Sequence, residues 1–244
     1  MIVLQVAMRD EAAPLIERLR LRPAPDRLPP WAPMQAWRGE VAGDGAREQV
    51  ALVTHGVDAR FDVDLIATQP ATLAAHLAID RFQPRLLINA GTAGGFAGRG
   101  ARIGDVFLSR PPVMFHDRRI PLPGFEGSGL GSYPCLDGAA LAQQLGVKAG
   151  VISTGNALDL PECDRAELER TGADAKEMEA AAIAWICDLR AVPMLAIKAI
   201  TDLVDGHTPT ERQFLEHLRV ASEELARITE MVVRRLAGRP EAIR

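Results

Sequence analysis

The 244-residue chain contains only three cysteines, Cys135, Cys163 and Cys187, which are widely spaced and form no CxxC pair. An odd number of isolated cysteines argues against a disulfide framework or a zinc site and favours a reducing compartment such as the cytoplasm. The sequence also lacks an apolar run long enough to span a bilayer. Its first residues turn charged at Arg9 without a basic leader, which predicts a first strand rather than a signal peptide.

An excess of charge of one sign is also missing. With 28 lysines and arginines against 32 acidic residues, the net charge is −4 and the isoelectric point is near 5.8. This balance gives no basic field, so we expect neither nucleic acid nor a membrane surface as a partner. The sequence has no GxGxxG motif, no Walker A lysine, no HExxH and no serine nucleophile elbow. Metal-ligand spacing is absent from His55, His76, His207 and His217.

Strand and helix patterns alternate along the chain. Apolar runs predict strands at 2–8, 86–90, 105–109, 150–153 and 194–200, with a strand pair at 37–41 and 49–54 joined by a GDG turn. Helical spacing predicts helices at 10–19, capped by Asp10, and at 64–82, 138–145, 178–189 and 210–236. No linker or internal repeat interrupts this pattern. We therefore expect residues 1–244 to form a single α/β domain, with a twisted, mostly parallel or mixed central sheet flanked by helices.

Two acidic residues interrupt segments that otherwise have the character of a core. Glu179 lies in the helical pattern KEMEAAAIAWICDL, and Asp202 follows the apolar run at 194–200. A buried carboxylate is unfavourable unless it is hydrogen-bonded or has a function. Ligands of open α/β sheets bind beyond the carboxyl ends of strands, where Asp202 is expected. The simpler alternatives are a carboxylate satisfied by backbone donors for Glu179 and a turn or helix cap for Asp202.

Three further segments have weaker signals. Glu11 follows the first strand, although a solvated glutamate in the first turn of a helix would give the same pattern. The glycines of INAGTAGGF would let backbone N–H groups approach an anion or a ribose hydroxyl, or would simply form a tight turn. The segment from Arg110 to Pro134 is rich in proline and glycine, and such long loops are often functional. Together, these segments indicate a small-molecule site.

These motifs, in this order, resemble the 5′-methylthioadenosine/S-adenosylhomocysteine nucleosidases of the nucleoside phosphorylase superfamily. The resemblance covers nearly the whole chain and rests on VAMRDEAAPL, INAGTAGGF, FHDRRIP, VISTGNALDL, KEMEAAAIA and KAITDLVDG. The HDRRIP loop and the lysine of KAITD are most similar to the plant-type branch, which prefers methylthioadenosine. The resemblance implies a homodimer without metal or organic cofactor. Its reaction would be hydrolysis of the N-glycosidic bond of 5′-methylthioadenosine, or also of S-adenosylhomocysteine, which releases adenine.

The resemblance also implies residue roles. Glu11 would be the base that activates water, Glu179 would bind the ribose hydroxyls as an ionised carboxylate, and Asp202 would protonate adenine N7. Burial at a strand end can raise the pKa of Asp202 toward the range that a general acid needs. The remaining expected substrate contacts are Thr92, Ala93, Gly94, Leu158, Met178, Lys198, Thr201, Val57 and Ile120. The last two belong to the apolar 5′ pocket, with Ile120 supplied by the partner subunit.

Some positions depart from the family pattern, and other functions stay open. Asn156 stands where the family usually has aspartate, Lys198 stands where most members have arginine, and no aromatic residue precedes Phe214 to close the 5′ pocket. A nucleoside phosphorylase is less consistent with the sequence, because Glu11 would repel phosphate and the nearest cation is Arg9. A nucleosidase for 5′-deoxyadenosine or aminofutalosine is a second alternative. A nucleoside-binding protein without catalysis is a third, disfavoured because all three acids are present.

Overall fold

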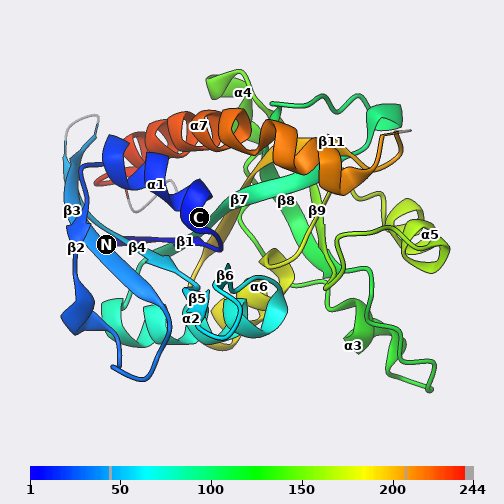
Figure 1. The fold of residues 1–244 in the computed structure, drawn as a ribbon, viewed down its shortest axis with the longest axis horizontal. Helices are drawn as coiled ribbons and strands as arrows, with labels where there is room; N and C mark the ends of the chain where they lie inside the picture. The colour runs from blue at the N-terminus through cyan, green and yellow to red at the C-terminus, as the bar shows by residue number, and fades with distance from the viewer. Residues whose placement is uncertain (44–45, 207, 240–244) are drawn as a thin grey trace.

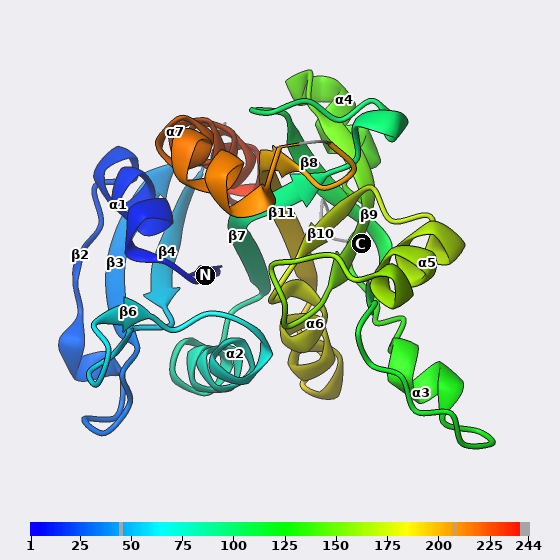
Figure 2. The same ribbon diagram turned by 45° about the vertical axis from the view of Figure 1, so that its right-hand side comes forward.

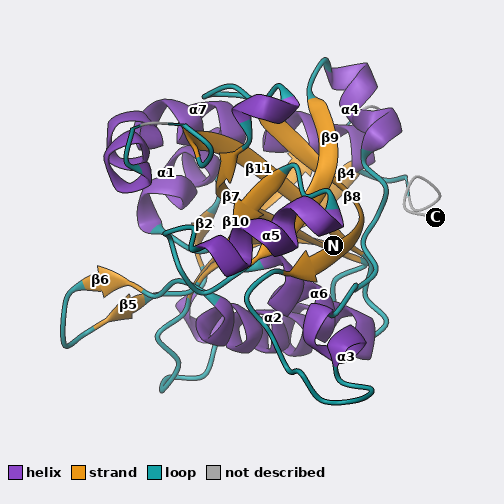
Figure 3. Cartoon of the chain, turned by 90° about the vertical axis from the view of Figure 1, so that its right-hand side faces the viewer, coloured by secondary structure: helices purple, strands orange, loops and turns teal. Residues whose placement is uncertain are grey.

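The computed structural model describes residues 1–43, 46–206 and 208–239, which form a mixed sheet between two layers of helices (Figure 1). The strands of this sheet are β1 (Ile2–Val6), β2 (Arg22–Pro23), β3 (Gln35–Ala42), β4 (Arg47–Thr54), β7 (Leu86–Gly95), β8 (Val106–Phe115), β9 (Lys148–Thr154), β10 (Ala175–Glu177) and β11 (Met194–Leu203). Their order across the sheet is β10-β9-β8-β11-β7-β1-β4-β3-β2. A separate hairpin consists of β5 (Val57–Asp58) and β6 (Val63–Asp64) and projects from one end of the molecule (Figure 3).

The helices are α1 (Arg9–Arg18), α2 (Thr68–Phe82), α3 (Glu126–Leu130), α4 (Ala139–Leu145), α5 (Glu162–Thr171), α6 (Ala180–Leu189) and α7 (Thr210–Leu236), with short 3₁₀ turns at Pro25–Arg27 and Ala97–Arg99. Helices α1 and α7 pack together on one face of the sheet, and α2 and α6 pack together on the other (Figure 2). In α7, Ala221, Leu225, Ile228 and Val232 recur at helical spacing and are buried. This stripe explains why so long a helix lies flat on the sheet.

The central strands β1, β7 and β11 are covered on both faces, which fits their nearly unbroken apolar sequences. β7 pairs in parallel with β1 and β11, so the carboxyl ends of these three strands meet at one edge. The short strand β10 closes one half of the sheet. It pairs in parallel with β9 and antiparallel with β7, where Lys176 lies opposite Gly94. Residues of β7, β10 and β11 are thereby brought around one hollow.

The α/β class and the expected alternation of strands and helices are confirmed. The secondary structure of the glycine segment INAGTAGGF and of the residues after the 194–200 run differs from expectation. β7 continues through Thr92 to Gly95, and β11 continues through Asp202, so both segments lie within strands rather than beyond them. The reason is long-range pairing: β10 and β11 bind the glycines of β7 from either side. A register shift between Ile200 and Asp202 marks the place where β11 bulges.

Several predicted boundaries of helices and loops also differ from those in the structure. Helix α1 begins at Arg9 with Met8 as its N-cap, so Asp10 lies in the first turn and is not the cap. Helix α2 begins at Thr68 rather than at Asp64, which belongs to β6. Glu179 precedes α6 as its N-cap residue. The expected loop at 110–134 contains the end of β8 and helix α3. Part of the expected GDG turn, Asp44 and Gly45, lies outside the described residues, as does His207.

Helix α5 has no counterpart among the predicted elements. Its sequence, ECDRAELERT, is strongly polar, and the buried side chains within it are Asp164 and Leu168. A helix with so narrow an apolar contact gives almost no periodic signal. Among the described residues, no helix is long and apolar enough to cross a membrane.

Candidate active site

A pocket opens at the edge where β1, β7 and β11 end. Nine of the expected site residues line it: Glu11, Thr92, Ala93, Gly94, Leu158, Met178, Glu179, Thr201 and Asp202. The rest of the lining consists of Ala7, Met8, Ile66, Lys176, Glu177, Val204, Thr210 and Phe214. Its ionisable groups fall into two clusters. The first, which we call the glutamate side, contains Glu11, Glu177 and Glu179, with Lys198 behind them. The second, which we call the aspartate side, contains Asp202 and Lys176, together with the hydroxyl of Thr201.

Glu11 reaches the pocket from the first turn of α1 and is held by β7. Its Oε1 atom accepts hydrogen bonds from the backbone N–H and the hydroxyl of Thr92, both at 2.7 Å, and Oε2 accepts one from the N–H of Met8 at 3.2 Å. Burial raises the pKa of Glu11, although the hydrogen bonds from Thr92 and the charge of Lys198 oppose this shift. The site therefore holds a fixed carboxylate with increased affinity for a proton.

Glu179 enters the pocket at the start of α6. Its Oε1 atom accepts a hydrogen bond from the N–H of Ala67 at 2.8 Å. Burial raises the pKa of Glu179 to about 7, with Lys198 opposing the shift and the carboxylate of Glu177 adding to it. Both charge states of Glu179 are therefore accessible near neutral pH, because burial and the neighbouring carboxylates favour the neutral acid while Lys198 favours the anion.

Ala67 has an unusual backbone conformation, with φ of 74° and ψ of −172°. This region of backbone space is nearly restricted to glycine, and an alanine there stores strain. The strained peptide directs its N–H at Glu179, which links the loop before α2 to the glutamate side.

Lys198 lies behind the pocket rather than in its wall. The side chain is fully buried, and its Nζ is 2.7 Å from Oε2 of Glu177. Glu177 also accepts hydrogen bonds from the hydroxyl of Thr154 and from the N–H groups of Glu179 and Ala180, the latter two at 2.9–3.0 Å. Lys198 is therefore bound by Glu177 and is not among the residues that line the pocket of the single chain. Its expected contact with substrate stays a prediction.

The charges of this pair are mutually stabilised. Burial alone would raise the pKa of Glu177, but the ammonium group and the hydrogen bonds outweigh it, and the net shift is downward. Burial likewise lowers the pKa of Lys198, yet the charges of Glu177 and Glu179 outweigh it and raise the pKa overall. Both groups are therefore charged at neutral pH.

Asp202 on β11 has a hydrogen-bond partner for only one of its two carboxyl oxygens. Its Oδ1 atom accepts a hydrogen bond from the hydroxyl of Thr201 at 2.8 Å, while the buried Oδ2 atom has no hydrogen-bond partner. Burial raises the pKa of Asp202, with Thr201, Lys176 and His217 opposing the shift. A Cβ atom added at Gly94 would lie 2.7 Å from Oδ2, so the glycine provides the space that this carboxyl group occupies.

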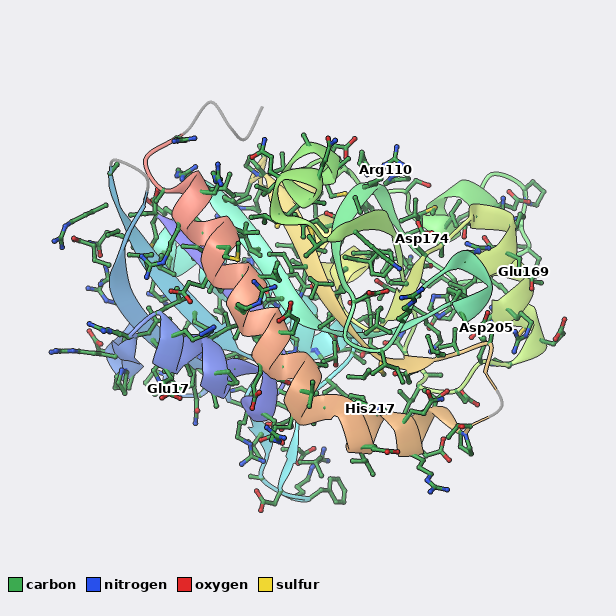
Figure 4. All side chains as sticks on the ribbon, turned by 90° about the horizontal axis from the view of Figure 1, so that it is seen from above. Glu17, Arg110, Glu169, Asp174, Asp205 and His217 are labelled. Atoms are coloured by element: carbon green, nitrogen blue, oxygen red, sulfur yellow. The ribbon has the colours of Figure 1, made fainter. Side chains whose placement is uncertain are left out.

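The connection between β11 and α7 closes the aspartate side from behind. Asp205 accepts hydrogen bonds from the N–H groups of Ala97 and Gly98 at 2.7 and 2.8 Å. On α7, Nδ1 of His217 donates to the carbonyl of Gln213 at 2.7 Å and lies 3.2 Å from the carbonyl of Thr201. Figure 4 labels Asp205 in this connection and His217 on α7. Both contacts fix the strand end that carries Asp202.

Two expected contacts lie outside the pocket of the single chain. Val57 is in the β5–β6 hairpin, and Ile120 borders a separate hollow beside Phe115 and Leu130. Asn156 joins two segments near the pocket entrance. Its backbone and side-chain N–H groups donate to Asp117 at 2.6 and 3.0 Å, and its Oδ1 accepts from the N–H and hydroxyl of Thr68. An amide is suited to this bridge because it donates and accepts at once, whereas an aspartate would repel Asp117.

The sequence reasoning missed Lys176 and Glu177 and did not assign Ile66, Val204 or Thr210 to the pocket. KEM could have suggested Lys176, because in an extended segment Lys176 and the expected contact Met178 project to the same face. Phe214, on the first turns of α7, supplies the aromatic side chain that earlier positions lack.

Comparison with known proteins defines the class of protein first. A family model described as the phosphorylase superfamily matches residues 1–234. A 5′-methylthioadenosine nucleosidase of Arabidopsis thaliana is 37% identical over 98% of this chain and 88% of its own length. A 5′-methylthioadenosine/S-adenosylhomocysteine nucleosidase of the same organism is 37% identical, with 98% and 92% covered. The apo structure of the Arabidopsis 5′-methylthioadenosine nucleosidase superposes with a TM-score of 0.92 at 38% identity, covering 98% of this chain and 96% of that one.

The chain therefore belongs to the phosphorylase superfamily and, within it, to the family of 5′-methylthioadenosine/S-adenosylhomocysteine nucleosidases. Its match to Arabidopsis proteins agrees with the resemblance to the plant-type branch.

Proposed function

We propose that the protein hydrolyses the N-glycosidic bond of 5′-methylthioadenosine, and of S-adenosylhomocysteine if the pocket admits it, to release adenine. The observation that carries this proposal is the presence, in one pocket, of a buried acid with a free oxygen and of two further carboxylates. Asp202 provides the first, and Glu11 and Glu179 provide the others. The named relatives are consistent with this activity.

The chemistry requires a proton for the leaving group. A bond between ribose and adenine breaks through a sugar that resembles an oxocarbenium ion, and protonation of the base at N7 makes adenine a better leaving group. Asp202 suits this role because burial raises its pKa and because its Oδ2 atom is unbonded. A general acid with a pKa near the working pH typically contributes 10²–10⁴-fold in rate.

The glutamate side faces the developing positive charge. Glu11 is held by Thr92 and Met8 in a fixed orientation, and its raised pKa suits a base that removes a proton from water. Glu179 would bind the ribose hydroxyls as a carboxylate, whose charge stabilises the cationic transition state more than the neutral substrate. The N–H of Ala67 occupies Oε1, so Oε2 is the oxygen available to a ribose hydroxyl.

Phosphorolysis is less consistent with the pocket. Among the described residues that line it there is no arginine, and Lys176, the cation in the wall, donates to the carbonyls of Ala157 and Leu158. Phosphate would also approach the carboxylate of Glu11. Adenine release should therefore proceed without phosphate, and a rate that depends on phosphate would overturn the hydrolytic assignment.

The 5′ substituent depends on apolar side chains. Ile66, Val204 and Phe214 in the lining favour a small apolar group such as methylthio over the polar extensions of homocysteine or aminofutalosine. Rates of adenine release from methylthioadenosine, S-adenosylhomocysteine, 5′-deoxyadenosine and aminofutalosine, measured side by side, test this preference.

The decisive variant is Asp202→Asn. We expect kcat to fall by about 10²–10⁴-fold with an unchanged circular dichroism spectrum, because the amide keeps the shape but cannot donate the proton. Near-normal kcat in this folded variant would contradict the role of Asp202.

We further propose that the protein is a cytoplasmic homodimer. The three cysteines form no disulfide. Apolar side chains are exposed on α6 and on the β5–β6 hairpin, including Trp185, Leu189 and Phe61. A second copy covering these groups could supply Ile120 to the 5′ pocket, which Ile120 does not reach within one chain. Light scattering after size exclusion tests the dimer, and a monomeric protein with full activity would contradict it.

A further inference from the structure

Lys176 is a nearly buried lysine in the wall of the pocket, for which the reaction proposed above has no role. Its side chain lies on the short strand β10 and only 4% of the residue is exposed. Nζ donates hydrogen bonds to the carbonyls of Ala157 at 2.6 Å and Leu158 at 3.1 Å. A lysine so deeply buried is rare unless its charge is stabilised or used.

The sheet aligns Lys176 with the proposed acid. Lys176 is opposite Gly94 on one side of β7, and Asp202 is opposite the same glycine on the other side. Residues directly opposite one another on neighbouring strands project to the same face. The three positions therefore form one row in which the central residue has no side chain.

Gly94 leaves room for the acid on this row. An added Cβ would lie 2.7 Å from Oδ2 of Asp202, so this carboxyl oxygen lies over the glycine. Oδ2 has no hydrogen-bond partner, and within residues 1–43, 46–206 and 208–239 no acidic oxygen lies within 4.0 Å of Nζ of Lys176. The two groups thus interact by charge across the row and not by a direct ion pair. This interaction opposes the upward pKa shift of Asp202 that burial produces.

We propose that Lys176 is a positioning residue of this site, which sets the strength of Asp202 as an acid across Gly94 and fixes the backbone at 157–158 beside the purine. The proposal rests on the proposed function. The ammonium group strengthens the acid, so that the proton transfers readily to N7. Its two carbonyl bonds hold the segment that contains Leu158, another residue of the pocket wall.

The test compares Lys176→Met with Lys176→Arg and with Lys148→Met. Lys148 is a half-exposed residue of β9 that pairs with Asp105 outside the pocket, so it controls for loss of a lysine as such. In Lys176→Met, Asp202 becomes a weaker acid and stays protonated to higher pH. The basic limb of the kcat/KM profile should therefore move to higher pH, with kcat reduced. Loss of two hydrogen bonds from a charged donor should raise KM about tenfold. Lys176→Arg and Lys148→Met should leave the basic limb unchanged.

A second readout does not depend on turnover. In protein labelled with ¹³C at aspartate carboxyl carbons, the Asp202 signal is identified by its loss in Asp202→Asn, and its titration midpoint should move up in Lys176→Met. An unchanged midpoint overturns the proposal even if the protein is active. A shifted midpoint without any adenine release leaves the charge coupling intact and contradicts the proposed function instead. If Lys176→Met does not fold, Lys176→Gln removes the charge while keeping a hydrogen-bond donor. The titration midpoint of Asp202 and the release of adenine then test the proposal in the same way.

Discussion

The glutamate side and the aspartate side of the pocket each contain a buried lysine, and the two lysines are bound differently. On the glutamate side, Lys198 lies 2.7 Å from Glu177 in a fully buried ion pair. On the aspartate side, Lys176 donates to backbone carbonyls and is separated from Asp202 by the row position of Gly94. The direct pair shifts the pKa of Glu177 down, whereas Asp202 retains a raised pKa.

This difference separates two uses of a buried carboxylate. A carboxylate in contact with an ammonium group and with several N–H donors keeps its negative charge and acts as part of the scaffold. A carboxyl group that has no direct contact with a cation keeps a raised pKa. It can therefore hold a proton and still donate it. Direct contact with the lysine and the number of hydrogen-bond donors together distinguish the two acids.

The largest expected effect is the loss of the ion pair on the glutamate side. We expect Lys198→Met to reduce the free energy of unfolding by about 3–5 kcal/mol, because Glu177 becomes an uncompensated buried charge. Urea denaturation measures the change. The double variant Glu177→Gln/Lys198→Met should recover most of the loss. Lys176→Met should be clearly less destabilising than Lys198→Met, and equal losses would remove the distinction between the two sides.

The next effect is a dependence of stability on pH through Glu179. Its folded pKa is about 7, above the ordinary value of 4.5, so the folded protein holds a proton that the unfolded chain has lost between these values. Stability is therefore lost as the pH rises from about 4.5 to 7, by roughly 3 kcal/mol at most. Glu179→Gln should reduce this slope in urea titrations, with a remainder from Glu11 and Asp202, whose pKa values burial also raises.

A matched surface control is available for this experiment. Glu162 has a 90% exposed side chain at the start of α5, and Glu162→Gln should leave the pH slope as it is in the parent protein. If the pH slope of Glu179→Gln equals that of the parent protein, another carboxyl group is responsible for it.

A smaller effect is expected from Gly94→Ala on the aspartate side. The added Cβ would lie 2.4 Å from Cγ1 of Val204 and 2.7 Å from Oδ2 of Asp202, so Asp202 must move. We expect a loss of about 1–3 kcal/mol in stability and a marked loss in kcat/KM. Gly127→Ala is the control, because its Cβ would meet nothing within 4 Å. Unchanged kcat/KM in Gly94→Ala would show that the position of Asp202 tolerates displacement.

The smallest effect concerns Ala67, which donates to Glu179 from a strained backbone. Ala67→Gly should raise the free energy of unfolding by about 1 kcal/mol, since relief of strain exceeds the entropy that glycine gains in the unfolded chain. Ala140→Gly, within α4, should instead lower it by about 0.5–1 kcal/mol. A loss of stability in Ala67→Gly would contradict the conclusion that the backbone of Ala67 is strained.

Much of this site could be predicted from local sequence. The acids Glu11, Glu179 and Asp202 could be identified because each is a carboxylate beside apolar sequence at the end of a predicted strand or helix, and the resemblance supplied their roles. The structure brings all three to one pocket. The boundaries at the glycine segment could not be predicted, because β7 continues only where β10 and β11 pair with it.

The two lysines illustrate what local patterns do not contain. Lys176 follows a polar helix and precedes a glutamate, so its burial depends on β10 pairing with both β9 and β7. Lys198 lies in an apolar run whose burial is evident, but its direction toward Glu177 depends on strand register. Both are consequences of contacts between segments far apart in the sequence.

The position of β7 between β1 and β11 has a consequence for synthesis. Glu11 follows the first strand, and Asp202 lies on the last, so the pocket joins early and late parts of the chain. A nascent chain on the ribosome exposes Glu11 long before β11 emerges, and nucleoside therefore cannot assist folding until β11 has been translated. Such late, long-range closure is typical of slow-folding topologies.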